Sequence, residues 1–111
     1  MRLGAAIGNN THLETLTVIL HGSSLSVEDR GFYDGLKRNS SIRAVFFFGV
    51  NVLNNNNIII GGVIHEILKV YQENSSNLTR MSFSNCNLVN GGADAVAATL
   101  RNCTHLNEIN L

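Results

Sequence analysis

The stretch Leu78-Thr-Arg-Met-Ser-Phe-Ser-Asn-Cys-Asn-Leu88 alternates apolar and polar residues through its middle. Such alternation predicts a short strand with one buried face. The chain continues with Gly92-Ala-Asp-Ala-Val-Ala-Ala-Thr-Leu100, which is rich in alanine and places Val96 and Leu100 four residues apart. Alanine favours helix, and residues four apart share one helix face, so this second stretch predicts a helix.

The same strand pattern occurs four times along the chain. Each block begins at an aliphatic residue, and these residues are separated by 29, 36 and 28 positions: Leu13, Ile42, Leu78 and Leu106. Before each block lies a pair of large apolar residues at helical spacing, namely Leu3 and Ile7, Phe32 and Leu36, Ile67 and Tyr71, Val96 and Leu100. The sequence therefore predicts four units of helix, turn and strand, with the strands near 13–18, 42–47, 78–83 and 106–111.

The longest of the three intervals contains Asn54-Asn-Asn-Asn-Ile-Ile-Ile60. We expect these extra residues to form an insertion near 53–61, in a loop between two units. This loop is either a binding loop or a tolerated insertion, because the free energy cost of closing a loop grows slowly with its length.

The third block resembles the leucine-rich repeat. Its pattern Leu78-x-x-Met81-x-Phe83-x-x-Cys86-x-Leu88 is followed by Gly92, Val96 and Leu100, as in that family. The spacing of 28 to 29 residues, with a helix in each unit, is similar to the ribonuclease-inhibitor type. The resemblance covers nearly all of the chain, but His21 and Val50 stand at the positions that correspond to Cys86.

The resemblance implies one α/β domain over residues 1–111, built as a short solenoid of about four repeats. Such a horseshoe segment has parallel strands on its concave face and helices on its convex face. The apolar positions of the repeat are then expected to form the core, and these are Leu13, Leu16, Val18, Ile42, Val45, Phe47, Leu78, Met81, Phe83, Leu88, Val96, Leu100, Leu106 and Ile109.

The residues between these buried aliphatics should point to the other face of the strands, because side chains alternate along a strand. Phe46 and Phe48 would then be exposed side by side, flanked by Arg43 and Arg80. Exposed aromatic residues beside arginines are typical of a protein interface. The alternative is that these rings pack against the insertion or another chain. The candidate partner-binding residues are Thr15, Thr17, Arg43, Phe46, Phe48, Arg80, Ser82, Glu108 and Asn110.

Charge and composition disfavour several classes of function. Eight basic and eight acidic residues give a net charge of zero, which disfavours a nucleic-acid binder or an anionic-membrane binder. The apolar stretch at the N-terminus is too short for a signal peptide, and the longest apolar run is too short to span a membrane. Two cysteines are too few for a disulfide scaffold, so we expect a soluble protein in a reducing, cytoplasmic compartment.

No pattern of catalytic or metal-binding residues is found. His12 and His105 occupy the same place in two units, within Thr-His-Leu, and the sequence holds no phosphate loop, nucleophile elbow or zinc motif. We therefore expect neither an enzyme nor a cofactor. Cys86 and Cys103 are interpreted as structural thiols, with redox activity as the alternative.

The 16 asparagines include five glycosylation sequons: Asn9, Asn39, Asn74, Asn77 and Asn102. Four of these lie in the same predicted turn between helix and strand, where asparagine bonds to its own backbone. Turn formation explains this pattern without glycosylation, which is the alternative.

The resemblance implies a scaffold that binds another protein through the concave face. The alternative is a structural repeat segment of a larger regulatory or sensor protein, without binding activity of its own. Neither end of the repeat pattern carries a polar cap, and solenoids normally have one. This predicts either a longer array of repeats or end-to-end self-association.

Overall fold

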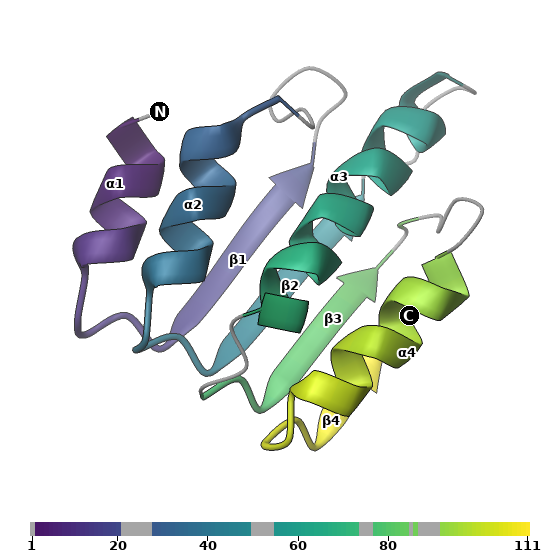
Figure 1. Cartoon of the computed structure of the whole chain (residues 1–111). Helices are drawn as coiled ribbons and strands as arrows, with labels where there is room; N and C mark the ends of the chain where they lie inside the picture. Colours follow the sequence, from purple (N-terminus) through teal and green to yellow (C-terminus); the bar gives the residue numbers. More distant parts are fainter. Residues whose placement is uncertain (1, 21–27, 50–54, 74–76, 85, 87–91) are drawn as a thin grey trace.

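The computed structural model describes residues 2–20, 28–49, 55–73, 77–84, 86 and 92–111. Helices and strands alternate along the chain (Figure 1). Their bounds, in chain order, are α1 Arg2–Asn9, β1 Thr15–Leu20, α2 Arg30–Arg38, β2 Ala44–Gly49, α3 Asn55–Glu73, β3 Arg80–Ser84, α4 Gly92–Asn102 and β4 Glu108–Asn110.

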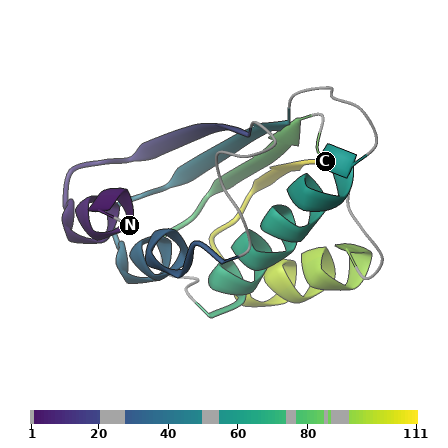
Figure 2. The same cartoon turned by 90° about the horizontal axis from the view of Figure 1, so that it is seen from above.

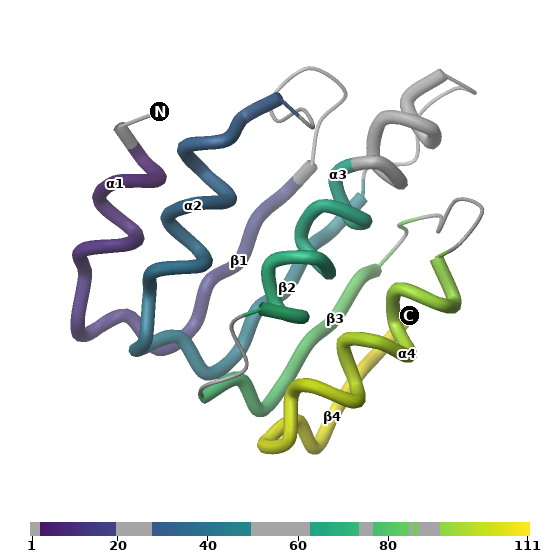
Figure 3. Tube along the Cα trace, viewed as in Figure 1, coloured from purple at the N-terminus to yellow at the C-terminus, as the bar shows by residue number. Residues whose placement is uncertain are grey.

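The four strands form one parallel sheet in the order β1-β2-β3-β4. All four helices lie on one face of this sheet, as the view from above shows (Figure 2). The helices follow one another in the same order as the strands (Figure 3). The prediction of an α/β fold with four parallel strands and four helices is therefore confirmed.

Each of the four strands begins two residues later than predicted, at Thr15, Ala44, Arg80 and Glu108. The second turn shows why. The side-chain oxygen of Asn39 accepts hydrogen bonds from the backbone N–H groups of Ser41 and Ile42, both at 2.8 Å. Because these N–H groups are used inside the turn, pairing with the neighbouring strand starts only beyond them.

The expected loop near 53–61 is corrected for residues 55–61, which belong to helix α3. Residues 53 and 54 lie outside the described part. The later residues Val63, Ile64, Ile67 and Leu68 are fully buried, and this burial outweighs the low helix propensity of asparagine. Neither this 19-residue helix nor any other within the described residues is long and apolar enough to cross a membrane.

The core lies between the sheet and the helices. Phe47 and Phe83 stack at its centre, with ring centroids 5.6 Å apart. Of the predicted core residues, Leu88 lies outside the described part, seven are buried and five are partly buried against the core. The buried seven are Ile42, Val45, Phe47, Leu78, Met81, Phe83 and Val96, and the partly buried five are Leu13, Leu16, Val18, Leu106 and Ile109.

Leu100 was predicted to be buried, and this is wrong, because its side chain is 44% exposed. Leu3, which heads the first predicted helix pair, is 57% exposed. Both residues belong to the outermost helices, α1 and α4, each of which has a neighbouring helix on one side only (Figure 1). The buried positions of α4 are Gly92, Ala95, Val96 and Thr99.

Helices α1 and α2 touch through their backbones. A Cβ atom added to Gly35 would overlap the carbonyl oxygen of Gly4, and one added to Gly4 would overlap the carbonyl oxygen of Gly31. Only glycine permits helix axes to approach this closely. The glycines therefore set the spacing of the first two units.

Candidate interaction surface

The face of the sheet opposite the helices carries the outward side chains of all four strands, and we call it the open sheet face. The strand register arranges these side chains in rows across the sheet. The first row is Thr15, Ala44, Arg80 and Glu108, the second is Thr17, Phe46, Ser82 and Asn110, and the third is Ile19, Phe48 and Ser84. These are the alternating positions that the sequence predicts to point away from the core.

The third row forms an apolar patch. Ile19 is 58% exposed and Phe48 is 39% exposed, and the two are register partners on adjacent strands. Opposite residues on paired strands have neighbouring side chains. The two side chains therefore place a continuous hydrocarbon surface in water, near the carboxyl ends of β1 and β2.

Phe46, one row away, is partly buried, and Arg80 covers it. The guanidinium of Arg80 lies 5.6 Å from the centre of the Phe46 ring, within the range of a cation–π contact. The same guanidinium forms an ion pair with Glu108. The charge of Arg80 is therefore paired with a carboxylate on the protein.

Most of the predicted partner-binding residues do meet on this one face. Thr15, Thr17, Glu108 and Asn110 are exposed there, whereas Ser82 is on the face but buried. Arg43 is not beside the aromatic rings. It precedes β2, forms an ion pair with Glu14 at 3.5 Å and lines a polar hollow with the turn residues. Ile19 is the most exposed apolar residue of the face, and only strand alternation marks it in the sequence.

The turns from helix to strand carry a hydrogen-bond network between neighbouring units. Asn39 is buried, and its amide nitrogen donates to the carbonyl oxygens of Ile7 at 2.7 Å and Asn10 at 3.0 Å. Asn77 donates in the same way to Ser40, and Asn102 donates to Gln72. Of these three, Asn39 also forms the expected turn with its own backbone, because its oxygen accepts from Ser41 and Ile42.

The sequon at Asn39 has no room for a glycan, because this side chain is buried and donates both of its hydrogen bonds to carbonyls. Asn9 accepts a hydrogen bond from Arg38 at 3.4 Å. The sequon at Asn74 lies outside the described residues.

Both cysteines have the environment of structural thiols. The thiol of Cys103 is buried and donates to the carbonyl oxygen of Tyr71 at 3.2 Å. Cys86 is partly buried and contacts the carbonyl oxygen of Ser84 at 3.3 Å. Burial raises the pKa of the Cys103 thiol and also that of Cys86. A raised pKa lowers the fraction of reactive thiolate at neutral pH.

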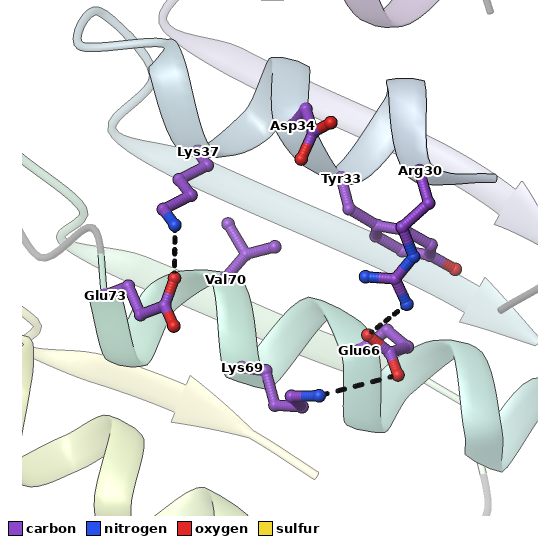
Figure 4. A pocket seen from close by; sticks show the side chains of 8 residues that line it. All are labelled: Arg30, Tyr33, Asp34, Lys37, Glu66, Lys69, Val70 and Glu73. Atoms are coloured by element: carbon purple, nitrogen blue, oxygen red, sulfur yellow. Dashed lines mark hydrogen bonds and ion pairs between the residues drawn. The ribbon is translucent and has the colours of Figure 1, made fainter. Parts of the chain in front are cut away.

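A groove between α2 and α3 is a feature that the sequence analysis missed (Figure 4). It encloses about 160 Å³, and each helix contributes four residues at positions i, i+3, i+4 and i+7. This spacing is the signal that could have revealed it. The lining residues are Arg30, Tyr33, Asp34 and Lys37 of α2 and Glu66, Lys69, Val70 and Glu73 of α3.

The charges of this groove are balanced by pairing across it. Arg30 contacts Glu66 at 3.0 Å, and Lys37 forms an ion pair with Glu73 (Figure 4). The hydrogen bond from Lys37 lowers the pKa of Glu73 and raises the pKa of Lys37. Burial raises the pKa of Tyr33 far above its usual value, so its hydroxyl stays protonated. The groove therefore joins the two helices through ion pairs across it.

Within the described residues, no three His, Cys, Asp or Glu side chains are grouped so as to hold a metal ion. No protein-family model matches the chain, and no curated protein sequence matches it either. The open sheet face, with its exposed apolar side chains, is the candidate functional surface of the chain.

Proposed function

We propose that this chain is a protein-binding module of the leucine-rich-repeat kind, a short solenoid segment that binds a partner protein through its open sheet face. The observation that carries the proposal is the pair Ile19 and Phe48, exposed next to each other on a face that no described helix covers. When a partner covers exposed aromatic and aliphatic side chains, their removal from water lowers the free energy of the complex.

The character of the face agrees with a protein ligand of low charge. Arg80 is paired with Glu108, and Arg43 at the rim is paired with Glu14. A phosphate-rich ligand needs cations that are not already paired with carboxylates on the protein. An apolar side chain of a partner, by contrast, needs only the patch formed by Ile19 and Phe48, with Phe46 beside it.

The test is a selection of binding peptides from a displayed random library, with the 111-residue chain as bait. Enriched peptides are then titrated against Phe48→Ser and Phe46→Ser variants. We expect affinity to fall about tenfold or more for Phe48→Ser, because this substitution removes the exposed ring from the centre of the patch. Far-ultraviolet circular dichroism verifies that each variant remains folded.

Leu100→Ser is the matched control. Leu100 is about as exposed as Phe48 but lies on α4, away from the open sheet face. Peptide affinity should be unchanged in this variant. Peptides that bind equally well to the wild type and to both phenylalanine variants would contradict the proposal.

The alternative is a structural segment whose surfaces pack against other parts of a larger assembly. The exposure of Leu3, Leu100 and Leu111 favours it, because these residues do not belong to the rows of the open sheet face. In that case the Phe46→Ser and Phe48→Ser substitutions would cause aggregation or loss of folding, and no peptide would depend on Phe48 alone.

A further inference from the structure

The junctions between neighbouring units share one set of backbone hydrogen bonds. The carbonyl oxygen just before each strand accepts two N–H groups from the start of the next strand. Glu14 accepts from Arg43 and Ala44, Arg43 accepts from Thr79 and Arg80, and Thr79 accepts from Asn107 and Glu108, at distances from 2.7 to 3.2 Å. All three junctions of the described structure are therefore built alike.

A side-chain hydrogen bond recurs at two of these junctions. The amide of Asn39 donates to the carbonyl oxygen of Ile7, and the thiol of Cys103 donates to that of Tyr71. Asn39 and Cys103 each lie three residues before the aliphatic residue that opens a block. Ile7 and Tyr71 are the last large buried residues of α1 and α3. Each such unit thus presents a side-chain donor to the preceding unit and a backbone carbonyl acceptor to the following unit.

The outer side of the first unit carries this donor without an acceptor. Asn10 occupies the position of Asn39, and its oxygen accepts from the backbone N–H groups of His12 at 2.8 Å and Leu13 at 2.7 Å. This is the turn that Asn39 forms with its own neighbours. The amide nitrogen of Asn10, however, donates to no described residue, and the exposed Leu3 lies on the same helix–strand unit.

The outer side of the last unit carries the matching features. Leu100 occupies the position of Ile7 and Tyr71, so its carbonyl corresponds to the acceptor of the side-chain hydrogen bond. Asn107 occupies the position of Glu14, Arg43 and Thr79, so its carbonyl corresponds to the acceptor of the two backbone hydrogen bonds. The side chains of Leu100 and Leu111 are exposed at this edge. The edge strands β1 and β4 each have one side without a neighbouring strand.

The helices at the two edges carry small side chains, which permit an approach like that of α3 and α4 but not the backbone contact of α1 and α2. Ala6 corresponds in position to Gly35, which faces the preceding helix, and Ala97 corresponds to Gly4, which faces the following helix. Both alanines are exposed, and both side chains are small. No large charged side chain takes their place, in contrast to the groove between α2 and α3.

We propose that the α1–β1 edge of one copy of this chain docks on the α4–β4 edge of a second copy, head to tail. The contact repeats the junctions inside the chain, with Asn10 donating to the Leu100 carbonyl, Leu3 and Leu100 covered, and β1 of one copy paired with β4 of the other. Such an interface joins two different surfaces, so it adds further copies at both ends. It uses none of the aromatic residues of the open sheet face and is independent of the proposed function.

The first experiment measures the mass of the 111-residue chain by light scattering after size exclusion, from about 1 µM to about 1 mM, where interfaces with dissociation constants from micromolar to millimolar become visible. We expect the mean mass to rise through dimer and trimer with concentration. A chain that stays monomeric over this range overturns the proposal.

The second experiment uses two blocked variants, Leu3→Lys and Leu100→Lys, each of which places a charge at one edge. Each variant alone should stay monomeric, because one of its two edges cannot dock. A mixture of the two should give a dimer and nothing larger, since one functional edge of each kind remains. Association of either variant alone to the wild-type mass overturns the proposal.

Ile19→Lys is the matched control, since Ile19 is as exposed as Leu3 but lies on the open sheet face. It should associate like the wild type. Loss of association in this control, with both edge variants still associating, would mean that two copies meet face to face and would overturn the head-to-tail contact. Circular dichroism of all three variants verifies that these exposed substitutions leave the fold intact.

Discussion

Asn39 shows how one side chain couples neighbouring units. Its oxygen closes the turn on its own unit, and its nitrogen reaches the carbonyls of Ile7 and Asn10 in the preceding unit. A buried polar group of this kind is stabilising only while its partners are in place. Asparagine supplies both a donor and an acceptor, which is the chemical reason for its presence here.

The first prediction concerns this residue. Asn39→Asp keeps the size of the side chain and replaces the donor with an oxygen that faces two carbonyl oxygens. We expect the free energy of unfolding to fall by about 1–3 kcal/mol or more, since a buried group loses its partner and a charge is buried. Urea denaturation followed by circular dichroism measures the change.

Asn102→Asp is the control for this prediction. The amide of Asn102 also donates to a carbonyl of the preceding unit, that of Gln72, but the side chain is exposed. Water replaces the lost donor there, so the loss of stability should be no more than about 0.5 kcal/mol. Equal losses in the two variants would show that burial of Asn39 is not the source of the effect.

At the scale of the elements, the helix layer consists of two close pairs with a charged groove between them. Glycines bring α1 and α2 into backbone contact. Ala95 and Thr99 allow α4 to lie close to α3, and the Thr99 hydroxyl is within hydrogen-bonding distance of the carbonyl oxygens of Ala95 at 2.8 Å and Leu68 at 3.2 Å. Between α2 and α3 the facing residues are long and charged, so ion pairs across the groove replace close packing.

The second prediction concerns the close pair α1 and α2. Gly35→Ala would force a methyl group onto the Gly4 carbonyl, and the two helices would have to separate. We expect a loss of about 1–3 kcal/mol, typical of overpacking, although alanine itself favours helix. Thermal and urea unfolding of the variant measure this loss.

Gly8→Ala is the matched control, because its added methyl group would meet only the end of the flexible Arg38 side chain, at 2.7 Å. That side chain can move away. The variant should be as stable as the wild type, or more stable by up to about 1 kcal/mol because of helix propensity. A loss equal to that of Gly35→Ala would contradict the role of the helix contact.

At the scale of the whole molecule, one sheet separates a covered face from an open one. The side chains of Val45, Phe47, Met81 and Phe83 fill the covered face completely. The strand side chains that face the helices are less buried in β1 and β4, where Leu16, Val18 and Ile109 are only partly buried. The stability of the fold therefore depends mainly on the two central strands, and the edges contribute less.

The third prediction tests this distribution of stability. Leu78→Ala removes a buried side chain from the segment just before β3 and should lower the free energy of unfolding by about 2–5 kcal/mol. Leu100→Ala, at the exposed edge, should lower it by less than about 1 kcal/mol. Calorimetric melting of both variants, at concentrations low enough to exclude association, gives the comparison. Similar losses would mean that the core extends to the α4 edge.

The sequence pattern predicts burial correctly for residues of the central strands, which have a neighbouring strand on each side. Phe47 and Phe83 alternate with outward residues at strand spacing, and their burial was predicted correctly. The predicted burial of Leu100 is wrong, because periodicity identifies a helix face but does not reveal that the helix lies at the edge of the helix layer. The predicted loop is also wrong for Asn55 to Asn57, whose local preference for a loop is outweighed by the buried residues that follow in α3.

The open sheet face also combines features that the sequence predicts with features that it does not. Alternation alone placed Thr17, Phe46 and Phe48 on one face, since side chains of a strand must point to opposite sides. The sequence did not predict that Arg80 would cover Phe46, or that Arg43 would turn to Glu14. Such choices depend on which charged groups come within reach after folding.

The sequence by itself determined the order of helix and strand and the side of the sheet on which each strand residue lies. These features follow from the periodicity of the backbone, which is local. Only the tertiary structure decided the register of the strands, which of the described apolar residues are exposed and which charges pair across α2 and α3. These features depend on contacts between segments about 30 residues apart, and such contacts exist only when the units are stacked.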